Sequence, residues 1–119
     1  MPRYAILRHD VPDGTRHFDL LFERNGVLKA WRWFGPAWPP ERFPAEVEEH
    51  VDHRPLYLDY EGPLTENRGA VRRVEGGEYE VLAWRDVRVE MRIGSLRWLW
   101  ERTDRIGRKN PLWRLEGIR

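Results

Sequence analysis

One segment constrains the fold more than any other: residues 17–23 place apolar side chains at alternate positions and run directly into Asn25-Gly26. A strand turns successive side chains to opposite faces, so Phe18, Leu20 and Phe22 would share one face of a sheet. Asn-Gly is the strongest short hairpin signal, because both positions of its tight turn need positive φ. We therefore predict an antiparallel hairpin whose second strand is Val27 to Trp33.

The rest of the chain repeats this pattern of short apolar runs between turn residues. We predict further strands over 4–9, 56–60, 70–82 (a hairpin about Gly76-Gly77), 87–93 and 96–103 (about Gly94-Ser95), and 112–118. Residues 34–44 hold four prolines and are predicted to be a long irregular loop, and Ala45 to His50 a short helical turn. Seven or eight such strands predict a mainly β fold with little helix, a single-domain antiparallel β-barrel over residues 1–119.

Composition narrows the class of protein. At 119 residues there is room for one domain. The chain has no cysteine, which excludes disulfides, thiolate zinc sites and a cysteine nucleophile. It also lacks a run of about 20 apolar residues that could span a membrane. Met1-Pro2-Arg3-Tyr4 begins no signal-peptide pattern. We expect a cytoplasmic domain with no membrane partner.

The net charge of +1 hides an uneven distribution. Residues 1–67 carry 8 basic and 12 acidic side chains and all four histidines, whereas residues 68–119 carry 13 basic and 8 acidic ones. An acidic, histidine-bearing part beside a basic part suits a cation held next to a polyanion. The alternative is that these charges only coat a small surface.

His17-Phe18-Asp19 is the first candidate site. On a strand, residues i and i+2 share a face about 7 Å apart, so this imidazole and this carboxylate could converge on one ion. His9 would supply a third ligand if its strand pairs alongside. Mixed histidine and aspartate ligation suits manganese or zinc better than calcium. The alternative is an ordinary surface pair on a half-exposed strand.

His53 and Tyr57 form the second candidate, as an anion clamp or proton donor. The alternative is that His53 ends a turn before Pro55 while Tyr57 packs in the core. His50 and His53 could instead bind metal themselves from one face of a helix, but Pro55 favours an extended chain at this point. Phosphate-binding glycine loops are absent, and Ser95, the only serine, lies in a predicted turn.

In order, these segments resemble the 3′-phosphoesterase domain of bacterial DNA ligase D and its small stand-alone relatives. The matching segments are His9, His17-Phe18-Asp19-Leu20-Leu21-Phe22-Glu23, Gly26-Val27-Leu28-Lys29-Ala30-Trp31, and His53-Arg54-Pro55-Leu56-Tyr57-Leu58-Asp59-Tyr60-Glu61-Gly62. The resemblance covers about residues 4–80, with a weaker echo over 89–103. It implies a β-barrel whose divalent metal, Mn²⁺ before Zn²⁺, is held by His9, His17 and Asp19.

The resemblance also implies an activity: removal of 3′-phosphates and terminal ribonucleotides from DNA or RNA ends during end repair. His53 would contact the scissile phosphate and Tyr57 would support it. The implied partners are nucleic-acid 3′ ends and the DNA ligase or polymerase of an end-joining pathway.

The sequence departs from the family at several phosphate contacts. Leu21 stands where the family has arginine, and Phe34 where it has a basic residue. A further expected arginine aligns near Ala45, with Arg42 a shifted substitute, and seven residues rather than five separate His9 from His17. Candidate replacement cations are Arg8, Arg16, Arg54 and Arg68.

Three hypotheses follow from the retained ligands and the missing contacts. The first is a metal-dependent phosphoesterase acting on 3′ ends, in which Leu21→Arg should raise activity. The second is a catalytically weakened relative that binds nucleic-acid ends or a repair partner. The third is an enzyme acting on a small phosphorylated compound.

Overall fold

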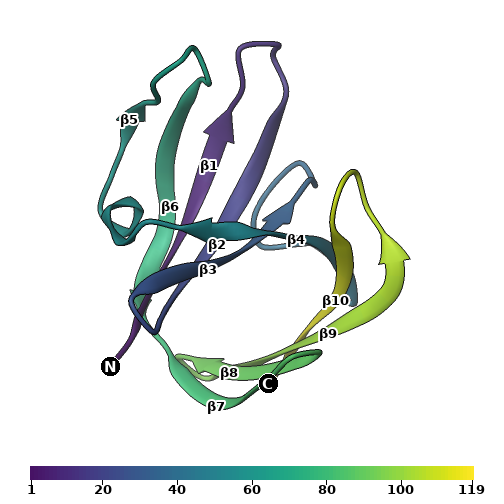
Figure 1. The fold of residues 1–119 in the computed structure, drawn as a ribbon. Coiled ribbons are helices and arrows are strands. Elements are labelled where there is room, and N and C mark those ends of the chain that lie inside the picture. Colours follow the sequence, from purple (N-terminus) through teal and green to yellow (C-terminus); the bar gives the residue numbers. More distant parts are fainter.

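The computed structural model describes residues 1–119 and consists of ten strands and one 3-10 helix (Figure 1). The elements are β1 (Arg3–Asp10), β2 (Arg16–Arg24), β3 (Val27–Trp33), β4 (Ala45–His53), η1 (Pro55–Leu58), β5 (Gly62–Pro63), β6 (Ala70–Glu78), β7 (Glu80–Arg85), β8 (Arg88–Ile93), β9 (Leu96–Ile106) and β10 (Pro111–Ile118). No helix has the length and apolar character needed to cross a membrane.

All ten strands belong to one antiparallel sheet, in the order β5-β6-β1-β2-β3-β4-β10-β9-β8-β7. The predicted mainly β, antiparallel class is confirmed, but the predicted closure into a barrel is wrong. The reason lies at Tyr79, the only residue between β6 and β7. With one residue between them, β7 cannot fold back beside β6, and the two strands lie near opposite ends of the sheet without pairing. The sheet curls over itself and stays open (Figure 1).

Two predicted hairpins are confirmed. In the β2–β3 hairpin Arg24 pairs with Val27, and Asn25 and Gly26 have φ of 52° and 83°, as a type I′ turn requires. In the β8–β9 hairpin, Ile93 pairs with Leu96 across Gly94-Ser95.

Three local predictions are wrong. Residues 45–50, predicted to be helical, lie in β4, which pairs with both β3 and β10. Residues 56–60, predicted to be a strand, lie mostly in η1, where Pro55 occupies the first turn and needs no N–H partner. The chain does not turn at Gly76-Gly77, because both glycines lie in β6 and pair with β1.

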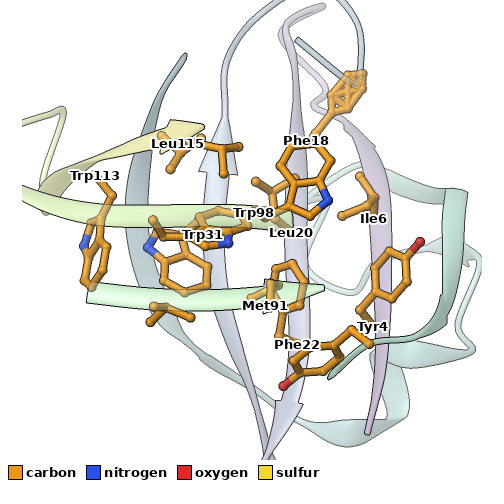
Figure 2. Close-up of a cluster of buried hydrophobic side chains, with 14 residues drawn as sticks. Tyr4, Ile6, Phe18, Leu20, Phe22, Trp31, Met91, Trp98, Trp113 and Leu115 are labelled. Atoms are coloured by element: carbon orange, nitrogen blue, oxygen red, sulfur yellow. The ribbon is translucent and has the colours of Figure 1, made fainter. Parts of the chain in front are cut away.

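A large aromatic core fills the inside of the curled sheet (Figure 2). It joins β1–β4 to β8–β10 through fourteen buried side chains: Tyr4, Ile6, Phe18, Leu20, Phe22, Trp31, Val47, Tyr79, Val89, Met91, Trp98, Trp100, Trp113 and Leu115. Trp31 and Trp100 stack at its centre with ring centroids 4.4 Å apart. Burial of so many aromatic rings supplies the main stabilisation of this sheet.

The opposite face of β1–β3 carries a second, smaller cluster. Its buried members are Ala5, Leu7, Leu21, Leu28, Ala30, Leu58 and Val71, with Tyr57 packed against them. Alternation along β2 explains the division: Leu20 belongs to the aromatic core and Leu21 to this cluster. His17 and Asp19 are in step with Leu21, so they lie on this second face.

Candidate metal centre

His9, His17 and Asp19 converge on the second face of the sheet. The β1–β2 register pairs His9 directly with His17, and Asp19 follows on the same face of β2. His9 Nδ1 lies 3.1 Å from His17 Nε2, and His17 Nε2 lies 3.3 Å from a carboxylate oxygen of Asp19. All three residues are at most 9% exposed. The two additional residues between the histidines lie in the tight loop from Val11 to Thr15, so the longer spacing leaves their pairing intact.

The donor set fits a divalent transition metal. Each residue offers one ligand atom, and the three atoms lie within 4.8 Å of one another. Two ligand atoms that are each about 2.1 Å from one ion lie about 3.0–3.4 Å apart at tetrahedral to octahedral angles, which matches the two shorter separations. Imidazole and carboxylate together suit Mn²⁺ and Zn²⁺.

The hydrogen bonding of His9 prepares its ring for this task. Nε2 lies 2.7 Å from the backbone oxygen of Arg68, and a carbonyl only accepts, so Nε2 carries the proton. The neutral ring therefore keeps its Nδ1 lone pair, and that atom faces His17. Such an outer hydrogen bond fixes the tautomer and the orientation of a metal-binding histidine.

Asp19 is held as a carboxylate. Burial alone would raise its pKa, but the hydrogen bond and charge of His17, together with the charge of Arg32, outweigh burial and lower that pKa. Arg32 Nε donates to Asp19 Oδ1 at 3.0 Å. The site thus presents an ionised oxygen ligand at neutral pH.

The cluster opens into a cavity of about 320 Å³. His9 and Asp19 line it beside both residues predicted for phosphate chemistry, His53 and Tyr57. His53 Nδ1 donates to the backbone oxygen of Val51 at 2.9 Å, which directs Nε2 away from that contact, and the His53 and Tyr57 ring centroids are 5.8 Å apart. Residues from β1, β2, β4 and η1 are thus brought together as the sequence predicted.

The cavity is also lined by Arg32, Arg54 and Arg68. Two of these were predicted as replacement cations, whereas Arg8 and Arg16 pair with Asp10 instead. The sequence interpretation missed Arg32, which the β2–β3 register places opposite Asp19. Counting back from the Asn25-Gly26 turn would have found it, because a two-residue hairpin fixes every pair.

His50 also lines the cavity but is not part of the metal cluster. Its ring centroid lies 5.5 Å from that of His53, and the three-residue donor group does not include it. Burial, with the nearby charges of Arg32 and His53, lowers its pKa to about 4. His50 is therefore neutral at physiological pH.

The departures from the resembled family have separate structural settings. Leu21 is fully buried in the second cluster and faces no solvent. Ala45 is buried at the start of β4, and Arg42 lies in the proline-rich loop outside the cavity. Phe34 packs near His17 and carries the guanidinium of Arg108 over its ring.

Comparison with known proteins adds no assignment. No protein-family model matches the sequence, and a search of curated proteins gives no significant match.

Proposed function

We propose that this protein is a divalent-metal-dependent phosphoesterase that acts on the 3′ ends of DNA or RNA, removing a 3′-phosphate or a terminal ribonucleotide. One observation carries the proposal: the His9, His17 and Asp19 donor group borders a cavity that also holds three arginines, His53 and Tyr57. Metal ligands beside convergent cations suit an anionic phosphate ester.

His9, His17 and Asp19 would hold the metal, Mn²⁺ before Zn²⁺. When bound, such an ion polarises a phosphoryl oxygen and neutralises developing negative charge. Arg32 uses Nε to hold Asp19, and its terminal nitrogens make no hydrogen bond within the protein. They remain available to grip phosphate oxygens, a task for which the planar guanidinium is well shaped.

His53 and Tyr57 complete the proposed site. The Nδ1 contact of His53 fixes its ring and leaves Nε2 to bind the scissile phosphate or to give a proton to the leaving oxygen. Tyr57 packs at the edge of this ring and supports its position. Arg54 adds a cation that has no carboxylate partner within 4.0 Å, as expected for a side chain that meets a mobile ligand.

A second candidate is a catalytically weakened relative that binds nucleic-acid ends, or the ligase or polymerase of an end-joining pathway. The burial of Leu21 favours it, since no guanidinium can act from that position. The arginines in the cavity favour the first candidate, because they replace the missing charge from other elements.

The test is a 3′-end assay with the purified protein. A DNA strand labelled at its 5′ end and phosphorylated at its 3′ end is incubated with Mn²⁺, with Zn²⁺ or with a chelator. We expect Mn²⁺-dependent loss of the 3′-phosphate, abolished by His53→Ala and weakened by Tyr57→Phe. Retained DNA binding without turnover would support the weakened relative instead. Turnover of a small phosphate ester without DNA binding would support a small-molecule enzyme.

Metal analysis tests the ligand assignment separately. His17→Ala should abolish Mn²⁺ uptake. His50→Ala is a matched control, because it removes a nearby imidazole that lies outside the donor group. Equal metal content in His17→Ala and the unaltered protein would refute the assignment.

A further inference from the structure

The turn between β9 and β10 reaches the candidate metal centre from the far end of the chain. It contains Gly107 to Asn110, and the N–H of Gly107 donates to the oxygen of Asn110 at 2.8 Å. The Arg108 guanidinium lies 4.0 Å from the centroid of the Phe34 ring, and that ring centroid lies 5.7 Å from that of His17. A cation is thus placed one aromatic ring away from a metal ligand.

This turn is held by an unusual clamp. Glu48, on β4 and only 6% exposed, accepts backbone N–H groups from Arg108 at 2.8 Å, Lys109 at 3.0 Å and Asn110 at 3.0 Å. Gly107 permits the close approach, because a Cβ there would collide with the Glu48 carboxylate and with Leu112. The turn is therefore fixed in position rather than free to swing.

The clamp uses the Glu48 charge on backbone groups and leaves the Arg108 side chain unpaired. Arg108 is exposed, and no carboxylate oxygen lies within 4.0 Å of its guanidinium, whereas Arg105 on the same hairpin is paired with Glu46. Its contact with Phe34 restrains the guanidinium without neutralising it. A rigid, solvent-facing cation of this kind suits a phosphate group.

The metal cluster lies between this cation and the cavity. His9 and Asp19 line the cavity, whereas His17 does not line it and instead contacts Phe34. Cations therefore flank the cluster on two sides: Arg32, Arg54 and Arg68 in the cavity, and Arg108 beyond His17. A single small phosphate ester has no group with which to reach both.

We propose that Arg108 binds an internal phosphodiester of the substrate strand while the terminal phosphate occupies the cavity. The inference rests on the proposed function, since it takes a nucleic-acid 3′ end as the ligand. It narrows the substrate class to an oligonucleotide with at least one phosphodiester upstream of its 3′ end. It also accounts for Phe34, whose ring supports a cation supplied by the opposite end of the chain.

The test compares two ligands in Arg108→Ala. Binding of a fluorescent, single-stranded oligonucleotide with a 3′-phosphate is followed by anisotropy over a range of salt concentrations. We expect affinity to fall about 5- to 10-fold, and the slope of log K against log salt to decrease by about 0.7, the value for one lost contact with a single strand. Hydrolysis of a mononucleoside 3′-phosphate should be unchanged.

Two further variants make the comparison specific. Arg105→Ala removes an arginine that is exposed on the same hairpin but paired with Glu46, and it should change oligonucleotide affinity less than 2-fold. Arg108→Lys keeps the charge and should restore most of the salt slope. Thermal unfolding of each variant shows whether the hairpin remains folded.

The inference and the proposed function fail in different ways. Hydrolysis by the unaltered protein combined with unchanged oligonucleotide affinity in Arg108→Ala would overturn the inference alone. Weaker oligonucleotide binding by Arg108→Ala in a protein that hydrolyses nothing would support the Arg108 contact and overturn the enzymatic function. An equal loss on the mononucleotide would also overturn the inference, because it would place Arg108 at the terminal phosphate.

Discussion

Replacing Glu48 by glutamine tests how the β9–β10 turn is held. Glu48 Oε1 accepts the Arg108 N–H, and Oε2 accepts those of Lys109 and Asn110. Glutamine keeps the shape of the side chain but has one oxygen, no charge and two N–H groups of its own. Even if its oxygen keeps two of the three bonds, the remaining backbone N–H faces another donor and loses its acceptor.

The magnitude follows from these three bonds. A hydrogen bond to a charged group contributes about 1.5–3 kcal/mol, against about 0.5–1.5 kcal/mol for a neutral one. Losing roughly 1 kcal/mol at each of three bonds gives about 3 kcal/mol, and relaxation of the turn toward water recovers part of it. We expect Glu48→Gln to lower the free energy of unfolding by about 2–3 kcal/mol at pH 7.

The pH dependence supplies an independent check. Burial alone would raise the pKa of Glu48, but the three backbone N–H groups outweigh it and lower that pKa below its ordinary value of 4.5. A lowered carboxyl pKa stabilises the folded state above the unfolded pKa, and this stabilisation is lost as pH falls through the folded pKa. The difference between the unaltered protein and Glu48→Gln should be complete at pH 7 and shrink below about pH 4.

Urea unfolding followed by circular dichroism measures this loss. With a slope of about 2 kcal/mol per molar for a chain of this size, the midpoint should fall by about 1–1.5 M. Glu46→Gln is the control, since Glu46 is exposed on the same strand and paired only with Arg105, a contact worth at most about 1 kcal/mol. A Glu48→Gln loss no larger than that of the control would refute the clamp.

Three further outcomes are expected. Leu21→Arg puts a charge into a fully buried apolar cluster and should cost about 3 kcal/mol or more in urea unfolding, against less than about 1.5 for Leu21→Met, so a gain in activity with no loss of stability would contradict the packing. Gly26→Ala forces φ of +83° on a residue with a Cβ and should cost about 1 kcal/mol in thermal unfolding, and no change would argue against the type I′ turn. Mn²⁺ at 100 times its Kd should raise the free energy of unfolding by about 2.7 kcal/mol, seen as a thermal shift of about 10 °C that His17→Ala lacks.

Local signals predicted those parts of the fold in which neighbouring residues decide the structure. Asn25-Gly26 accepts positive φ at both positions, so the β2–β3 hairpin and its register could be predicted from two residues. The metal ligands followed from the same period-two pattern, once β1 was assumed to pair beside β2. That register itself could not be derived, because the Val11–Thr15 loop contains no dipeptide that fixes one turn type.

Long-range partners decided the segments that were predicted wrongly. Residues 45–50 are acidic and short enough to suit a helical turn, but β4 is held as a strand by β3 on one side and by β10, from the end of the chain, on the other. Glu48 finds its backbone partners about sixty residues away, beyond any local window. Gly76 indicated a turn, whereas it serves close packing: a Cβ there would collide with the side chain of Arg73.

The replacement at Leu21 shows why a motif can lose a charge that the folded site retains. Two positions along a strand are separated by about 7 Å, but directly paired residues on neighbouring antiparallel strands have Cβ atoms about 4.5–5.5 Å apart. Arg32 pairs with Asp19 across β2 and β3, so its guanidinium begins closer to the ligand than a side chain at position 21 would. It also leaves Leu21 free to seal the second cluster beneath the metal centre. A guanidinium that reaches a site across two strands is invisible to comparison along one strand, which is why the loss of a motif residue does not by itself argue against phosphate chemistry here.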